Sequence, residues 1–190
     1  MNHPPVADAG ADQESYAGNV LSFNGSQSSD PDGDVLEHTW DFGDGNNATG
    51  VTPTHAFTSP GIYHVVVTVT DSHDASSTDT CIVTVTPVLF ISQIDMSLLK
   101  YWFYISGQAV VTITDQNGQP VSNAVVTGHW SGLTNDTDSP ATNSSGKATC
   151  MSDYRWSTPG TFTFTVDNVS KAGYHYAPER NVETSDSVSR

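Results

Sequence analysis

The run Asp30–Asp34 (Asp-Pro-Asp-Gly-Asp) is the densest group of chemically active side chains in this 190-residue sequence. Three carboxylates at alternate positions can supply hard oxygen ligands to a divalent cation such as Ca²⁺, which takes about six to eight oxygens. The run is not an EF-hand loop, because its sixth position is Val35 instead of Gly and its twelfth is Asp41 instead of Glu. The alternative interpretation is that these acids are solvated turn residues.

No arrangement of residues typical of an enzyme is present. The seven histidines lack the spacings His-x-His and His-Glu-x-x-His, and neither a Gly-x-Ser-x-Gly elbow nor a phosphate-binding loop occurs. Asp41 and Asp44 could be compared with the paired carboxylates of a glycosidase. Both lie next to or near glycine, where an aspartate accepts the backbone hydrogen bonds of a turn. We therefore predict that the chain is not an enzyme and has no catalytic residues.

Negative charge is concentrated in the first half of the chain. The sequence has 21 Asp and Glu against 6 Lys and Arg, and residues 1–86 contain twelve of the acids and no Lys or Arg. Such a surface repels phosphate backbones and anionic membranes, so we expect no nucleic-acid partner. No apolar run suits a membrane span and no signal peptide is visible, so we expect no membrane insertion and place any targeting segment outside this sequence. This concentration of negative charge either keeps the protein soluble or reflects acids that bind cations.

The two cysteines, Cys81 and Cys150, are too few for a disulfide framework. They lie roughly one in each half of the chain, so a bridge would have to join two domains. We predict two separate, buried and unpaired thiols, with the bridge as the alternative.

Apolar side chains alternate with polar ones in four segments: 61–71, 81–85, 108–115 and 160–167. A period of two residues is typical of half-buried strands in an antiparallel sandwich. No segment has a convincing helical period. The sequence therefore predicts an all-β fold.

A domain boundary is expected near Thr86-Pro87-Val88, where one alternating series stops and another apolar run begins. We predict two tandem immunoglobulin-like β-sandwiches, one over residues 1–86 and one over residues 87–190. Each is long enough to fold around its own small core.

Four motifs follow one another in the first half: Asn24–Gly33, Trp40–Gly45 (Trp-Asp-Phe-Gly-Asp-Gly), His55-x-Phe57 and the alternating run Gly61–Asp71. As a set they resemble the PKD (polycystic kidney disease) domain family. The resemblance covers about residues 4–86 and implies an immunoglobulin-like β-sandwich.

The same resemblance implies a calcium site, because PKD-like domains of some secreted proteases bind Ca²⁺ at one end of the sandwich. The implied ligands are Asp30, Asp32, the strand-ending Asp71 and the entering chain around Asn2 and His3. Three carboxylates, a main-chain carbonyl and water would complete such a site. Calcium is thus expected as a structural cofactor.

The second half is similar to bacterial immunoglobulin-like (Big-type) modules of secreted proteases and adhesins. The residues that carry this similarity are Val111–Val126, with its Asp-Gln-Asn-Gly-Gln-Pro-Val turn, Trp130–Gly132 and Thr142–Gly146. The cysteine pair that often flanks the last turn in such modules is missing here.

Three tryptophans of the second half, Trp102, Trp130 and Trp156, could line an aromatic face that binds sugar or protein. Core packing is the more common role of tryptophan in sandwiches, and we adopt it as the prediction. Trp102 lies in a run, Lys100–Tyr104, that is too aromatic to bury on one face only.

Together these patterns predict a non-catalytic accessory module of a larger secreted or cell-surface protein. It would act as a spacer, a stabiliser or a module that binds matrix or polysaccharide, with a role in adhesion. Its expected partners are other domains of the parent protein and extracellular protein or polysaccharide. The alternatives are a structural subunit of a cell-surface layer or filament and, less favoured, a free-standing hydrolase. A binding module should expose an aromatic patch, whereas a filament subunit should have long, unprotected edge strands.

Overall fold

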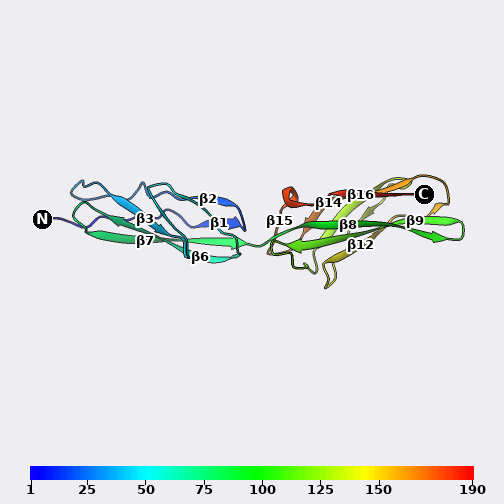
Figure 1. Cartoon of the computed structure of the whole chain (residues 1–190), viewed down its shortest axis with the longest axis horizontal. Helices are drawn as coiled ribbons and strands as arrows, with labels where there is room; N and C mark the ends of the chain where they lie inside the picture. The colour runs from blue at the N-terminus through cyan, green and yellow to red at the C-terminus, as the bar shows by residue number, and fades with distance from the viewer. The chain divides into compact units, whose positions relative to one another are not determined.

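The computed structural model describes all residues, 1–190, and consists almost entirely of β-structure (Figure 1). The chain divides into two compact units, Met1–Thr86 and Pro87–Arg190. The one helical element is a short 3₁₀ turn, η1 (Pro178–Arg180). No helix is long and apolar enough to cross a membrane. The predicted all-β class, with two tandem immunoglobulin-like sandwiches, is confirmed.

The first unit has a five-stranded sheet with the order β1-β7-β6-β3-β4 and a two-stranded sheet, β2-β5. Strand β1 pairs with β7 in parallel, and the other pairings are antiparallel. The strands are β1 (Gln13–Tyr16), β2 (Val20–Ser22), β3 (Glu37–Asp41), β4 (Asn47–Thr49), β5 (Thr54–Ala56), β6 (Gly61–Thr70) and β7 (Ser76–Thr86).

The core of the first unit is built by alternation along its strands. The alternate valines of β6 at 65, 67 and 69 are each 0% exposed. Trp40 of β3 is 1% exposed, and its ring centroid lies 5.7 Å from that of Phe23. The indole Nε1 of Trp40 donates a hydrogen bond of 3.0 Å to the carbonyl of Gly50, so burial leaves no polar atom of the ring unpaired.

The second unit has a four-stranded sheet, β11-β10-β14-β16, and a five-stranded sheet, β12-β9-β8-β15, with β13 also paired to β9. Its longest pairing is the hairpin of β8 and β9. The strands are β8 (Val88–Tyr101), β9 (Tyr104–Asp115), β10 (Val125–Gly132), β11 (Thr137–Asp138), β12 (Lys147–Met151), β13 (Arg155–Trp156), β14 (Thr161–Ser170), β15 (His175–Tyr176) and β16 (Ser185–Ser189).

Aromatic rings fill the core of the second unit and require glycine beside them. Trp130 is 1% exposed, and Phe162 and Phe164 are fully buried. A Cβ atom on Gly128 would lie 2.4 Å from Cζ of Phe164, and one on Gly107 would lie 2.8 Å from Cζ3 of Trp130. Strands β9 and β10 therefore need glycine at these two positions, because the aromatic rings occupy the space that a side chain would fill.

Both cysteines are buried and unpaired, as the sequence predicts. Burial, together with the nearby negative charge of Asp138, raises the pKa of Cys150 to about 12. Burial likewise raises the pKa of Cys81. Since the thiolate is the nucleophilic form, neither cysteine is suited to catalysis at neutral pH.

The prediction that the tryptophans of the second half pack in the core is correct for Trp130 and wrong for Trp102 and Trp156. The side chains of these two are 97% and 63% exposed. Trp102 lies in the turn of the β8–β9 hairpin and Trp156 on the short strand β13, which pairs with the end of β9. Their exposure shows that no second sheet covers this end of the hairpin.

Replacing Trp40 by alanine should lower the free energy of unfolding of the first unit by about 3–5 kcal/mol, because it leaves a cavity and an unpaired Gly50 carbonyl. Urea titration of the full chain, followed by circular dichroism, measures this change. The exposed residue Ile62 offers a control, and Ile62→Ala should change stability by less than about 0.5 kcal/mol. An unchanged urea midpoint for Trp40→Ala would contradict the buried position of this ring.

Candidate metal centre

The acidic loop that precedes β3 is organised around the side chain of Asp30. Its Oδ1 accepts hydrogen bonds from the backbone N–H of Asp32, at 2.7 Å, and of Asp34, at 3.3 Å. Gly33, with φ of +82°, completes the turn and donates its N–H to the carbonyl of Asp30. A left-handed residue at this position favours glycine. The turn brings three carboxylates to one end of the first unit.

The N-terminal segment is tied to these acids by hydrogen bonds. The backbone N–H of His3 donates to Oδ2 of Asp32 at 2.7 Å, and the imidazole Nδ1 lies 3.0 Å from Oδ1 of the same carboxylate. The side-chain amide of Asn2 donates to Oδ2 of Asp71 at 2.8 Å. Residues far apart in sequence therefore meet at a single acidic surface.

Asp71 follows β6 and is held by the turn that leads to β7. It is 5% exposed, and its Oδ1 accepts the backbone N–H groups of His73 and Ala75 at 2.8 and 2.9 Å. The same turn reaches the acidic loop, because His73 Nδ1 lies 3.1 Å from Oδ2 of Asp34 and Ser72 donates to its Oδ1 at 2.9 Å. Four aspartates thus share one end of the sandwich.

Hydrogen bonds hold the pKa values of two of these carboxyls below the ordinary 3.8 of aspartate. For Asp32 the largest cause is the backbone N–H of His3, followed by its side chain. For Asp71 the largest cause is the amide of Asn2, with backbone N–H groups of the following turn adding to it and burial opposing it. The charge of Asp71 raises the pKa of Asp32, so these two carboxylates lie near enough to repel each other.

The donor atoms at this end of the unit fit a hard divalent cation. Asp30, Asp32 and Asp34 each offer a carboxylate oxygen, and these atoms lie within 4.8 Å of one another. The Oδ2 atom of Asp30 is buried and has no hydrogen-bond partner. A buried, charged oxygen without a partner is costly, and a cation would satisfy it. An all-oxygen donor set suits Ca²⁺ or Mg²⁺.

The structure places the five predicted metal-site residues at this one end. It joins His3 to Asp32 and Asn2 to Asp71. In both contacts the N-terminal residue acts as a donor to a carboxylate. The ligand set implied by the family resemblance does not include Asp34, although the spacing of the acids already marks it as a possible ligand. It does not include His73 either, and nothing in the sequence marks that residue.

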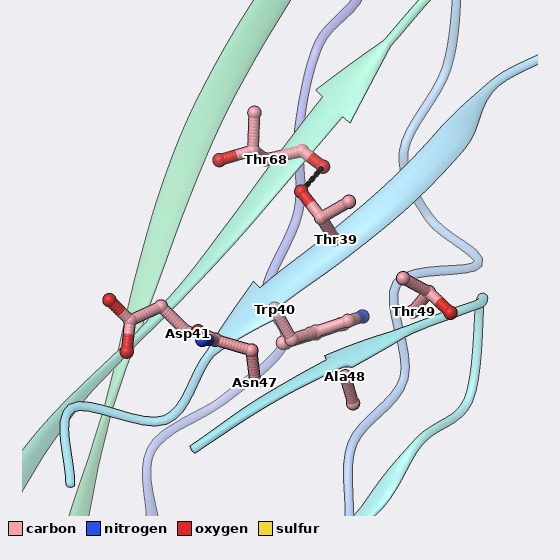
Figure 2. Close-up of a pocket in the computed structure, with 7 residues that line it drawn as sticks. All are labelled: Thr39, Trp40, Asp41, Asn47, Ala48, Thr49 and Thr68. Carbon is pink, nitrogen blue, oxygen red and sulfur yellow. Dashed lines mark hydrogen bonds between the residues drawn. The ribbon is translucent and has the colours of Figure 1, made fainter. Parts of the chain in front are cut away.

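Asp41 and Asp44, compared above with glycosidase carboxylates, serve as turn acceptors, as predicted. Oδ1 of Asp41 accepts the backbone N–H of Gly43 at 2.9 Å, and Oδ1 of Asp44 accepts that of Asn46 at 3.1 Å. Asp41 also borders a hollow of about 420 Å³ on β3, β4 and β6. Figure 2 shows this hollow, which has threonines along its border and Asp41 at one end beside Asn47. It contains a single carboxylate and no base.

Comparison with protein families identifies the first unit. Residues 2–85 match the family model described as "PKD domain". The N-terminal region of the chain is therefore a PKD domain. The similarity of residues 87–190 to bacterial immunoglobulin-like modules stays a prediction.

The relatives of this region are parts of large proteins. A "Microbial collagenase" of Vibrio alginolyticus is 38% identical over 79 residues, which cover 42% of this chain and 10% of that protein. The "Collagenase ColA" of Clostridium perfringens is 33% identical over 79 residues, or 42% of this chain and 7% of that protein. The "Pre-pro-metalloprotease PrtV" of Vibrio cholerae is 44% identical over 59 residues, or 31% and 6%. The chain spans about a tenth or less of these curated relatives.

Solved structures offer only distant likenesses. Carbohydrate-binding modules from the β-sandwich superfamily match with a TM-score of 0.43 and 18% identity, over 80% of this chain and 85% of that one. Fibronectin(III)-like modules of Clostridium thermocellum CbhA match with a TM-score of 0.34 and 12% identity, over 97% and 92%. Scores this low establish neither a shared fold nor a shared function.

The lowered pKa of Asp71 gives a pH dependence with a definite sign. Its ionised form is stabilised in the folded state, so the contribution is complete above the ordinary pKa of 3.8 and is lost as pH falls through the lower folded value. Asp71→Asn should therefore lower the melting temperature at pH 7. The difference from wild type should shrink as pH falls below 3.8.

Thermal melts of the full chain in EGTA, from pH 7 down to about pH 2, test this without interference from bound metal. The control is Glu14→Gln, which removes an exposed carboxylate of β1. Its melting temperature should depend on pH in the same way as that of wild type. A constant difference between Asp71→Asn and wild type at all pH values would contradict the assignment.

Proposed function

We propose that this chain is a non-catalytic accessory module of a larger secreted protein. The observation that carries the proposal is the match of residues 2–85 to the PKD domain, in a region that forms a tenth or less of the collagenases and the metalloprotease it resembles. In its parent protein, this unit would space the catalytic part or present it to an extracellular matrix. The turn roles of Asp41 and Asp44 agree with this assignment.

The short edge strands of the first unit favour a module over a subunit of a surface layer or filament. In the first unit the edge strands β1 and β4 have four and three residues. In the second unit β11 has two residues, and β16 and β12 have five each. Strands this short offer few free backbone groups for edge-to-edge pairing. The fourth edge differs, because β15 pairs with only the first two residues of the 14-residue strand β8, so the filament alternative would depend on the free side of β8.

The proposal includes a structural role for Ca²⁺ at Asp30, Asp32 and Asp34, with Asp71 beside them. The first 86 residues contain no Lys or Arg to offset the repulsion among these acids. A divalent cation would offset it and would satisfy the unpartnered Oδ2 of Asp30. Because Asp32 also holds His3, the ion would fasten the N-terminal segment to the unit.

Calcium at about 10 mM should raise the melting temperature of the first unit in the full chain by several degrees. Extracellular modules bind Ca²⁺ at about 10⁻⁴–10⁻³ M. Binding at ten times the Kd contributes about 1.4 kcal/mol, and about 1 kcal/mol shifts a small domain by 4–8 °C. Mg²⁺ should raise it less, because it demands near-octahedral geometry and gives up water reluctantly.

Two variants separate a specific site from charge screening. Asp30→Asn replaces the unpartnered oxygen with a neutral amide of the same shape and should abolish the calcium effect. Glu14→Gln also removes one negative charge, but at a position away from the site, and should leave the calcium effect unchanged. Equal responses to Ca²⁺ and Mg²⁺ in wild type and both variants would mean that no specific site exists.

The accessory role predicts that the purified chain is monomeric and has no hydrolytic activity of its own. Sedimentation velocity over a hundredfold range of concentration tests the first point, with Ca²⁺ present and absent. Incubation with fluorogenic gelatin and with chromogenic glycosides tests the second. Concentration-dependent polymers would support the filament alternative, and turnover would support the hydrolase; either result would overturn the proposal.

A further inference from the structure

Six aromatic side chains gather at one end of the second unit and form what we call the aromatic tip. They are Tyr101, Trp102, Phe103, Tyr104, Tyr154 and Trp156. Their exposed fractions range from 42% to 97%, and no other aromatic side chain of the chain is among the exposed residues. Large exposed apolar patches on soluble proteins usually mark binding sites.

The aromatic tip is built on paired strands. Tyr101 and Tyr104 face each other where β8 turns into β9, at the end of the hairpin far from Val88 (Figure 1). Strand β13 pairs Trp156 with Tyr104, and the backbone N–H of Ser157 donates to the carbonyl of Phe103 at 2.8 Å. These backbone contacts fix the strands that carry the rings before any ligand arrives, so the backbone need not be ordered on binding.

The rings also contact one another in two pairs. Tyr104 and Trp156 lie 4.8 Å apart between centroids at 34°, and Tyr101 and Tyr154 lie 5.7 Å apart at 80°. Tyr101, Tyr104 and Tyr154 together line an open hollow of about 380 Å³. This volume lies within the range of about 300–1,000 Å³ found for ligand pockets.

The two-residue turn between Tyr101 and Tyr104 calls for a left-handed residue at its first position, and the residue there is Trp102 instead of the usual Gly, Asn or Asp. Its φ is +48°, and the other non-glycine residues with positive φ are Asp74 and Asn123. Aspartate and asparagine tolerate this conformation, whereas a bulky residue there is a rare outlier. The ring is 97% exposed, so side-chain packing does not offset the free-energy cost of this backbone conformation. A strained residue that presents a large ring to solvent points to function.

We propose that the aromatic tip binds an uncharged polysaccharide; this inference rests on the accessory role proposed above and names a ligand for it. A pyranose ring has apolar C–H faces and a rim of hydroxyls. The flat rings would stack on the faces, and the hydroxyls of Tyr101, Tyr104 and Tyr154 would hydrogen-bond to the rim. These three tyrosines line the hollow, which is large enough for a sugar residue.

Charge and size favour an uncharged glycan over other occupants. Residues 87–190 hold nine Asp and Glu against six Lys and Arg, so the unit that carries the aromatic tip has no net positive charge to attract acidic polymers or anionic lipid. Two basic residues lie next to residues of the aromatic tip in the sequence: Arg155 donates its Nε to the carbonyl of Leu133, and Lys100 precedes Tyr101 and is exposed, so the charged polymer alginate is included as a control below. A protein partner would need about 20–30 residues a side, and the aromatic tip has six.

Affinity electrophoresis of the full chain tests the proposal. Native gels would contain hydroxyethyl cellulose, xyloglucan, galactomannan or soluble starch, with alginate as the charged control. We expect retardation by at least one of the four uncharged polymers and none by alginate. Tyr154→Ala and Trp102→Asn should each weaken the retardation about tenfold, as loss of a central aromatic contact does at binding hot spots.

Trp102→Asn also separates a binding role from a structural one. Asparagine suits the left-handed backbone, so this variant should keep or raise the melting temperature while binding falls. Val182→Ala changes a side chain that is 74% exposed elsewhere in the second unit and should bind like wild type.

Lack of retardation by all four uncharged polymers would overturn the proposal, as would equal retardation of wild type and both aromatic-tip variants. Sedimentation with phosphatidylcholine vesicles that requires Trp102, without retardation by polysaccharide, would assign the aromatic tip to a lipid surface instead. The assembly and turnover assays contain no polysaccharide. The sedimentation-velocity and hydrolysis assays therefore test the accessory role alone. The affinity gels alone test the assignment of the ligand.

Discussion

Alternation of side chains across each strand, with one face of every long strand turned toward a second sheet, is the constraint on which both units depend. It turns the valines of β6 and the residues Ala109, Val111 and Ile113 of β9 inward, where each is 0% exposed. The large rings Trp40 and Trp130 then fill the space between the sheets. The backbone N–H and C=O groups of the strands are paired within each sheet, so the core needs almost no polar side-chain atoms.

Where the alternation ends, a different balance of forces governs the chain. Asp71 follows the last residue of β6, and the acidic loop around Asp30 follows the bridge between Val6 and Ser29. These carboxylates are stabilised by backbone and amide donors instead of basic side chains. The Oδ2 atom of Asp30 is the one among them that is buried without a hydrogen-bond donor. The proposed cation would supply the partner that this oxygen lacks, so the proposal rests on ordinary hydrogen-bond satisfaction at the end of a sandwich.

The sequence predicted the parts of the fold that depend on near neighbours. The strand from Gly61 follows from alternation, and the unpaired thiols follow from the placement of one cysteine in each half of the chain. The acids around Asp30 follow from residue type and spacing. Two features could not be predicted, because each depends on contacts distant in sequence. His73 meets Asp34 only once β6 and the acidic loop share one end. Trp102 is exposed because the end of the β8–β9 hairpin is not covered by the other sheet of the unit, in which Trp130 lies.

The distribution of the four tryptophans gives each unit its own fluorescence signal. Trp40 is the one indole of the first unit, so its emission reports the packing of that core without interference once the other three are replaced by phenylalanine. In the second unit, Trp130 is shielded from water-soluble quenchers, whereas Trp102 and Trp156 are open to them. Iodide or acrylamide would therefore remove the red-shifted emission first and leave a blue-shifted spectrum from the two buried rings.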